Sequence, residues 1–174
     1  MFNSIWTLLG YDLEDSDSSK TIDSQKQNNS KKIILTNSFK TESDPKNFYF
    51  LSLINEDDHK WSIHGLWPQY TLTKYPRFCK NKKFDINKLD SIMDNLKKDW
   101  YSNRGPDVTF WEHEYLKHGT CNFNNLDEFN YFKTTLYLFE KAMSLKLPEL
   151  YFNPENGKCL IPVDQNLNFF KIKS

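Results

Sequence analysis

Three of the chain's four histidines fall in two short segments that also carry other residues suited to proton transfer. Residues 61–68 contain His64, and residues 110–121 contain His113 and His118. An imidazole titrates near neutral pH, so two histidines can remove one proton and supply another in the same reaction. The spacing therefore predicts an acid–base site built from two segments that are distant in the chain.

The second segment would gather several polar side chains if it formed a helix. At 100° per residue, four of them share one arc of about 140°. These are His113, Glu114, Lys117 and His118. A lysine can neutralise charge that grows on phosphate oxygens, and a carboxylate can orient a histidine. Such a group suits chemistry on a phosphodiester, and His64 would complete the acid–base pair.

A zinc-peptidase site is the first alternative, because His113-Glu114 also begins the metal-binding helix of those enzymes. That motif needs its second histidine four residues after the first, so that both imidazoles reach one ion. Here Lys117 occupies that position and His118 comes one residue later. An ammonium between two ligands would repel zinc, so we expect neither a metal nor another cofactor in the site.

The plain alternative is that these histidines have no special role. That interpretation suits one isolated histidine better than three, grouped with a glutamate and a lysine and flanked by tryptophans. We expect Trp61 and Trp111 to lie in the core. Trp67, just after the strand expected to carry His64, could lie there too or stack on a nucleic-acid base.

Strand-like segments flank the histidine-bearing region on both sides. Three come early, at residues 32–38, 47–54 and 61–66, and Pro68 is expected to end the last of them. Two come late, at residues 158–163 and 167–172. Each is rich in β-branched, aromatic or other apolar residues.

Three helices are expected between these strands. The first begins at Asp85, with apolar residues at helical spacing: Leu89, Ile92, Met93, Leu96 and Trp100. The second runs from Pro106 and Asp107 to about His118, with Gly119 as a C-terminal stop. The third opens near Asn125 and carries an apolar stripe: Phe129, Phe132, Leu136, Phe139 and Met143. Strands first, helices in the middle and strands last predict an α+β fold.

Composition limits the organisation and the partners of the chain. Its 174 residues fit one domain, with residues 1–30 as a flexible arm and residues 31–174 as the folded domain. The formal net charge is zero, so any nucleic-acid contact must depend on a local site. No apolar run approaches the length of a membrane span. Residues 1–10 lack a basic region and acidic residues follow at once, which favours an intracellular protein over a secreted one.

Both histidine segments closely resemble the active-site segments of the ribonuclease T2 family. The family's first segment reads His-Gly-Leu-Trp-Pro, present here as residues 64–68. Its second centres on Trp-x-His-Glu-x-x-Lys-His-Gly-Thr-Cys, matched here by residues 111–121. The similarity extends more weakly over residues 47–172.

The resemblance implies an α+β fold with an antiparallel β-sheet packed against several α-helices. It also implies metal-independent cleavage of single-stranded RNA by transphosphorylation to a 2′,3′-cyclic phosphate, followed by slower hydrolysis to a 3′-phosphate. DNA lacks the attacking 2′-hydroxyl and should resist cleavage. We expect the chain to act on RNA as a monomer.

Carried over residue by residue, the resemblance makes His64 and His118 the acid–base pair. We expect His118 to act as the base on the 2′-hydroxyl and His64 as the acid to the leaving 5′-oxygen, although the sequence does not itself determine this polarity. His113 would help to hold the phosphate. Glu114 and Lys117 would stabilise the pentacovalent transition state.

The cysteines and the base-binding positions follow the family only in part. Cys79 and Cys121 match a disulfide of the family, whereas Cys159 matches the first member of another pair and is expected to be a free thiol. Trp67 and Gln69 are candidates for contact with a base. Residues 55–60 replace the stretch that the family usually has before its first segment, so base preference does not transfer.

One basic stretch lies between the two segments: Lys74, Arg77, Lys80, Lys82 and Lys83. If Cys79 meets Cys121, this stretch lies near the active face and could steer phosphates, although a solvated loop is the simpler interpretation. The acidic residues 12–17 could fold over it as a self-inhibiting arm.

The rival function, from a different class, is a catalytically idle RNA-binding or protein-interaction module on the same fold. The presence of all five candidate catalytic residues argues against it, because an idle copy has no need of them.

Overall fold

The computed structural model describes residues 39–56 and 60–173 of the chain. The strand expected at residues 32–38 and the arm at residues 1–30 lie outside the described residues. Among those described, no helix is both long and apolar enough to cross a lipid bilayer.

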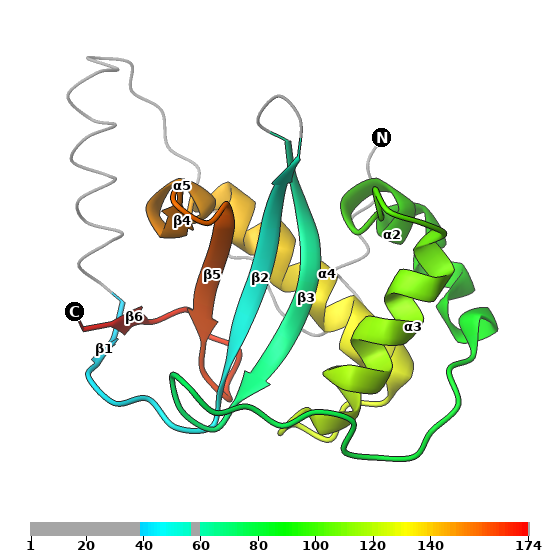
Figure 1. The fold of residues 1–174 in the computed structure, drawn as a ribbon, viewed down its shortest axis with the longest axis horizontal. Coiled ribbons are helices and arrows are strands. Elements are labelled where there is room, and N and C mark those ends of the chain that lie inside the picture. The colour runs from blue at the N-terminus through cyan, green and yellow to red at the C-terminus, as the bar shows by residue number, and fades with distance from the viewer. Residues whose placement is uncertain (1–38, 57–59, 174) are drawn as a thin grey trace, which may run out of the picture. The chain divides into compact units, whose positions relative to one another are not determined.

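A four-stranded antiparallel sheet in the order β3-β2-β5-β4 forms the centre of the fold (Figure 1). Its strands are β2 (Phe48–Glu56), β3 (Lys60–Gln69), β4 (Phe152–Asn153) and β5 (Lys158–Val163). A second, parallel pair joins β1 (Thr41–Glu42) to β6 (Lys171–Ile172). Strands were therefore correctly expected at 47–54, 61–66 and 158–163, but the one expected at 167–172 is reduced to two residues.

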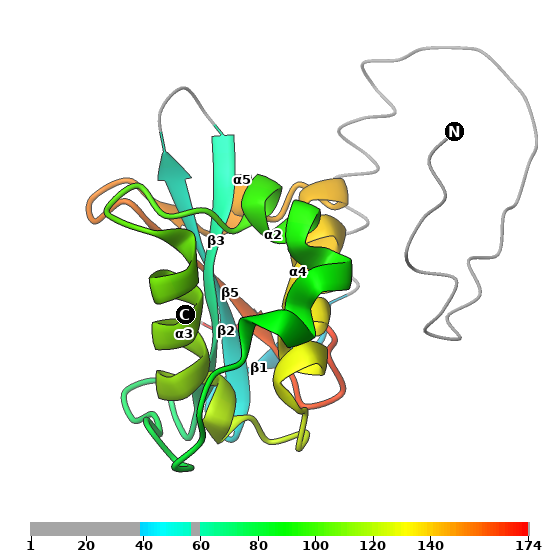
Figure 2. The same ribbon diagram turned by 90° about the vertical axis from the view of Figure 1, so that its right-hand side faces the viewer.

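The helices lie between β3 and β5 in the chain. They are a 3-10 helix η2 (Ile86–Ile92), α2 (Met93–Asp99), α3 (Asp107–Lys117), a 3-10 helix η3 (Gly119–Cys121), α4 (Glu128–Ser144) and α5 (Pro148–Tyr151). Figure 2 shows the strands of the sheet between α3 and α4. This arrangement confirms the expected α+β fold with an antiparallel sheet packed against helices.

Pro68 does not end β3, contrary to the expectation from the sequence. The strand continues to Gln69, and Pro68 pairs with Tyr49 of β2. β3 is an edge strand that pairs only with β2, so a residue without an N–H can be accommodated there.

The helix expected from Asp85 is divided in two. Asp85 is the N-cap, since its carboxylate accepts a hydrogen bond from the Asn87 N–H at 3.2 Å. A 3-10 helix follows first, and the α-helical part begins only at Met93.

The apolar stripe predicted for the third helix, now α4, is partly wrong. Phe132, Leu136 and Phe139 are buried as expected, whereas Met143 is 38% exposed. The buried face is broader and includes other residues: Tyr131, Thr135, Leu138 and Ala142. Tyrosine and threonine were missed because their polar groups have partners: the Tyr131 hydroxyl donates to the Leu66 carbonyl at 3.1 Å.

α3 ends at Lys117, just before Gly119, as expected. The chain continues through it into η3, and Gly157 is the glycine with a positive φ among the described residues. A Cβ at position 119 would overlap the ring of Tyr115 and crowd that of Tyr131. Glycine is needed here for close packing.

Candidate active site

His64 is the extra residue of a β-bulge in β3. Ser52 pairs with Gly65 and Leu53 pairs with Ile63, so His64 has no partner on β2. A bulge turns a side chain away from the regular alternation of a strand. Here the imidazole lies against α3, with its ring centroid 5.5 Å from that of Phe110.

Trp100 stabilises the bulge, whereas the sequence analysis placed this residue only on the apolar face of a helix. The Trp100 indole N–H donates to the backbone carbonyl of His64 at 3.0 Å. The Trp111 indole in turn donates to the Trp100 carbonyl at 2.6 Å. Trp111 is buried as expected, and Trp61 is half-buried against Phe152. Trp100 therefore supports the site from behind, a role that no sequence signal indicated.

The Glu114 carboxylate reaches both histidine segments from the buried side of α3. It is 1% exposed, and its Oε2 accepts a hydrogen bond of 2.8 Å from Trp67 Nε1. Its Oε1 lies 3.6 Å from His64 Nε2. A Cβ at Gly65 would overlap both Glu114 Oε2 and Trp67 Nε1, so the approach of β3 to α3 requires glycine at position 65.

Trp67 lies between the two principal histidines. Its ring stacks on that of His118, with centroids 5.2 Å apart and planes at 28°. It meets His64 edge to face at 5.0 Å. Its role in base stacking remains a prediction, since one face already packs on His118. Gln69 is buried, and its Nε2 lies 3.5 Å from the Trp67 carbonyl.

The polar residues near the C-terminal end of α3 differ in how deeply they are buried. His118 caps the helix, is 4% exposed, and donates its backbone N–H to the Glu114 carbonyl at 3.0 Å. Its Nδ1 is buried without a hydrogen-bond partner among the described residues. Lys117 is half-buried, while His113 is exposed at the rim. The polar residues of the expected arc thus occupy the floor and the edge of one site.

Burial changes the protonation of these groups. It lowers the pKa of His64 to about 4 and that of His118 to about 3, and the charge of Lys117 adds to both effects. Burial also lowers the pKa of His113. It raises the pKa of Glu114 to about 7, against the opposing effects of the Trp67 hydrogen bond and Lys117. Both His64 and His118 are therefore neutral at pH 7.

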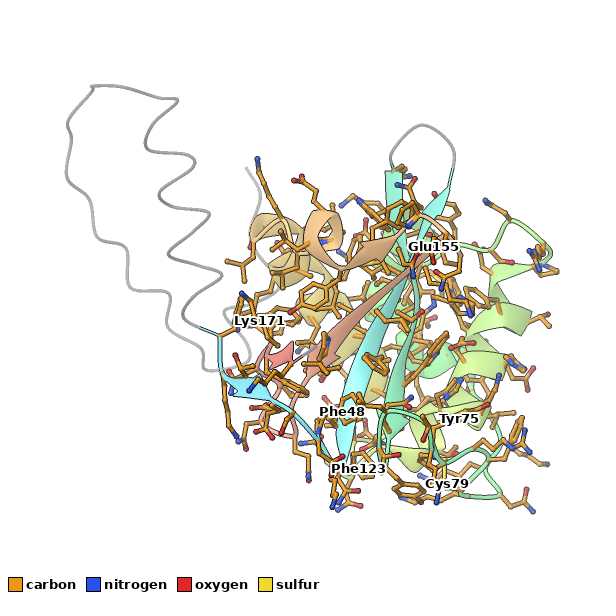
Figure 3. The ribbon with its side chains drawn as sticks, turned by 60° about the vertical axis from the view of Figure 1, so that its left-hand side comes forward. Phe48, Tyr75, Cys79, Phe123, Glu155 and Lys171 are labelled. Atoms are coloured by element: carbon orange, nitrogen blue, oxygen red, sulfur yellow. A yellow bond between two sulfur atoms is a disulfide. The ribbon has the colours of Figure 1, made fainter. Side chains whose placement is uncertain are left out.

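A disulfide between Cys79 and Cys121 ties the loop after β3 to the end of α3, as expected. The Phe78 N–H donates to the Lys117 carbonyl at 2.9 Å beside it. Cys159 is free and buried, also as expected. Tyr75 and Cys79 lie at the same end of the molecule (Figure 3).

The loop closed by this disulfide brings two exposed aromatic rings to the site. Tyr75 is 49% exposed and its ring lies 6.4 Å from that of His118. Phe78 lies 6.4 Å from His113. The sequence analysis considered only the basic residues of this loop. Aromatic residues interleaved with basic ones are typical of single-strand binding and could have identified both.

A family model and several curated relatives match this chain, and they agree on the same family. The sequence model of the Ribonuclease T2 family matches residues 22–156. Ribonuclease DdI of Dictyostelium discoideum is 35% identical over 115 residues, which cover 63% of this chain and 51% of that protein. Intracellular ribonuclease LX of Solanum lycopersicum is 36% identical over 105 residues, 58% of this chain and 44% of that protein. The chain thus spans about half the length of the curated relatives it matches.

Solved structures share the fold. Ribonuclease MC1 from the seeds of bitter gourd aligns with a TM-score of 0.59 at 18% identity, over 75% of this chain and 94% of that one. RNase NT in complex with 5′-AMP aligns with a TM-score of 0.56 at 24% identity, over 75% of this chain and 90% of that one.

Proposed function

The chain belongs to the ribonuclease T2 family, and on that premise we propose that it is an endoribonuclease that cleaves single-stranded RNA without a metal ion. Cleavage is a transphosphorylation that leaves a 2′,3′-cyclic phosphate, which is then slowly hydrolysed to a 3′-phosphate. The observation that most directly supports this proposal is the Glu114 carboxylate. It lies between His64 and Trp67, and the Trp67 ring stacks on His118.

His118 takes the proton of the 2′-hydroxyl in the first step. Its low pKa keeps it neutral, as a base must be. Because Nδ1 is buried, Nε2 is the nitrogen that meets the substrate, and the imidazole proton resides on Nδ1. The 2′-oxygen then attacks phosphorus, forming the O2′–P bond as the O5′–P bond breaks.

His64 supplies the proton to the leaving 5′-oxygen. For this it must enter the reaction as an imidazolium, which burial disfavours in the free protein. Glu114, with Oε1 at 3.6 Å from Nε2, orients the ring, and the bound phosphodiester anion favours the charged form. In the hydrolysis step the two histidines exchange roles, and water replaces the 5′-oxygen.

Lys117 and His113 hold the phosphate. The charge of Lys117 influences the pKa of His64, His118 and Glu114, so its ammonium acts at the centre of the site. An ammonium placed there stabilises the negative charge of the pentacovalent transition state.

Aromatic rings provide the contact surface for the bases. The partly exposed ring of Trp67 and the exposed ring of Tyr75 flank His118, and Gln69 lies behind Trp67. A base stacked on an aromatic ring contributes about 1–3 kcal/mol regardless of its identity.

The test is cleavage of a short RNA and its DNA counterpart in EDTA, by the full chain and by a His118→Ala variant. We expect cyclic-phosphate ends from RNA, no cleavage of DNA, and loss of cleavage in the variant. Activity that disappears in EDTA would contradict the metal-independent mechanism. No RNA cleavage between pH 3 and 8 by folded protein would favour the idle binding module instead.

A further inference from the structure

A second cavity, of about 620 Å³, lies outside the catalytic site. Its walls come from the loop after Cys79, from η2, from α3 and from the start of α4: Lys82, Lys83, Lys88, Tyr115, Asp127, Glu128 and Phe129. None of these is a candidate catalytic residue. The volume falls within the range of small-molecule binding sites.

Tyr115 is one of the residues that line this cavity. The residue is 2% exposed, and its ring packs against Phe84, Tyr131 and Phe132. The hydroxyl has no hydrogen-bond partner among the residues that the structure describes. Burial raises its pKa to about 12, so it remains a donor at all physiological pH values. The hydroxyl is therefore free to donate a hydrogen bond to a ligand in the cavity.

The acidic groups of the cavity are already engaged. Glu128 accepts from the Asp85 N–H at 2.7 Å and from Lys88 Nζ at 3.2 Å. Asp127 is the N-cap of α4 and accepts from the Asn130 N–H at 2.8 Å.

Two lysines of the cavity wall have no acidic partner among the described residues. Lys82 and Lys83 are exposed, and neither forms an ion pair with any part of the chain that the structure describes. Phe129, half-buried, adds an aromatic surface beside them. A ligand can therefore meet two ammonium donors, one hydroxyl donor and the ring of Phe129, over which Lys133 Nζ lies 5.6 Å from the centroid.

We propose that this cavity is a second binding site for a nucleotide phosphate, lined by residues other than the catalytic histidines. Lys82 and Lys83 bind the phosphate, the Tyr115 hydroxyl donates to the ligand, and the base packs on Phe129. The ligand comes either from a distal part of an RNA strand or from a free nucleotide, and both carry the same chemistry. The site itself does not depend on the ribonuclease activity, whereas its use by RNA rests on the proposed function.

Titration of the ¹⁵N-labelled full chain with adenosine 5′-monophosphate tests the site. We expect two groups of shifted resonances, one around His118 and one around Tyr115 and Phe129. Adenosine, which lacks the phosphate, should bind the second site at least about tenfold more weakly, since charged hydrogen bonds are the stronger ones. Shifts confined to the catalytic segments would overturn the proposal.

Three variants sharpen this test. The double variant Lys82→Ala/Lys83→Ala should lose at least about tenfold in affinity at the second site. Tyr115→Phe, which keeps the packed ring, should lose roughly 2–10-fold. Lys97→Ala/Lys98→Ala, a matched pair of exposed lysines in α2, should bind as the wild type does. A Lys82/Lys83 variant with wild-type affinity would refute the assignment.

Cleavage kinetics show whether the ligand of the cavity is part of an RNA strand or a free nucleotide. If an RNA strand reaches the cavity, the Lys82/Lys83 variant raises KM for a 20-nucleotide RNA several-fold and leaves a dinucleotide unaffected. If free nucleotides occupy it, both KM values stay constant while nucleotide binding is lost. Absence of cleavage in every variant, with binding at Tyr115 intact, would contradict the proposed function and not this site.

Discussion

The indole N–H of Trp67 donates a 2.8 Å hydrogen bond to the buried carboxylate of Glu114. Trp67 is on β3 and Glu114 on α3, so this single bond joins the two histidine segments across 47 positions of the chain. The same indole stacks on His118, and the same carboxylate faces His64. The spacing of the two histidines therefore depends on this pair.

Replacing Trp67 by Phe removes the donor and keeps most of the ring. A hydrogen bond to a buried charged group contributes about 1.5–3 kcal/mol, so we expect a loss of folding stability of that order. The pKa of Glu114 should rise further, because the Trp67 bond lowers it. Urea unfolding and carboxyl NMR titration measure the two effects, and an unchanged Glu114 pKa would contradict this account.

Gly65→Ala should disturb the same contact from the strand. The added methyl overlaps Glu114 Oε2 and Trp67 Nε1, so we expect about 1–3 kcal/mol of destabilisation and a marked loss of RNA cleavage. Gly105→Ala is the matched control, because nothing lies within 4 Å of its Cβ. Equal effects of the two substitutions on thermal unfolding and on kcat would refute the packing argument.

Glu114→Gln should make the protein more stable at high pH and less active. The folded-state pKa of Glu114 is raised to about 7 from 4.5, so the wild type loses stability as the pH rises from about 4.5 to 7. Glutamine does not ionise and escapes this loss, which we expect to reach on the order of 2 kcal/mol above pH 7. Urea unfolding at pH 4 and pH 8 checks the sign: the variant should gain stability only at pH 8.

Catalysis should be optimal at acid pH. The base His118 must be neutral and the acid His64 protonated, with pKa values of about 3 and about 4 in the free protein. Accordingly, kcat/KM should rise as the pH passes 3 and fall as it passes 4, whereas the kcat optimum lies higher because bound phosphate stabilises both imidazolium ions. A kcat/KM maximum above pH 7 would exclude this assignment.

Lys117 is expected to lower the pKa values of His64 and His118 and to stabilise the charge of the transition state. Removing its charge should allow these two effects to be measured separately. In Lys117→Gln the pKa values of His64 and His118 rise, since Lys117 lowers them, and the kcat/KM profile shifts to higher pH. The maximal kcat should fall by roughly 10²–10³ because a transition-state charge loses its partner. The exposed Lys98→Gln serves as the control and should alter neither quantity.

Breaking the Cys79–Cys121 disulfide should destabilise the domain and loosen the loop that carries Tyr75. For a separation of 42 residues, the loss of loop constraint is on the order of 4 kcal/mol. Urea unfolding with and without reductant measures it. The double variant Cys79→Ala/Cys121→Ala should match the reduced wild type and show no response to reductant.

The candidate catalytic residues, the order of the main strands and helices, and the disulfide were accessible from the sequence. His64, Glu114 and His118 stand out because their types and spacing are local properties of two segments. The strand at 47–54 and the α3 boundaries follow from residue periodicity and from Pro106, which are also local.

The tertiary structure alone determined how these residues meet. The bulge at His64 depends on the register between β2 and β3, and the support from Trp100 depends on packing between distant elements. The shifted pKa values arise from burial, which no spacing reveals. The extension of β3 through Pro68 follows from its place at the sheet edge. Local sequence specifies the chemistry of each side chain, whereas its depth and partners come from contacts between residues far apart in the chain.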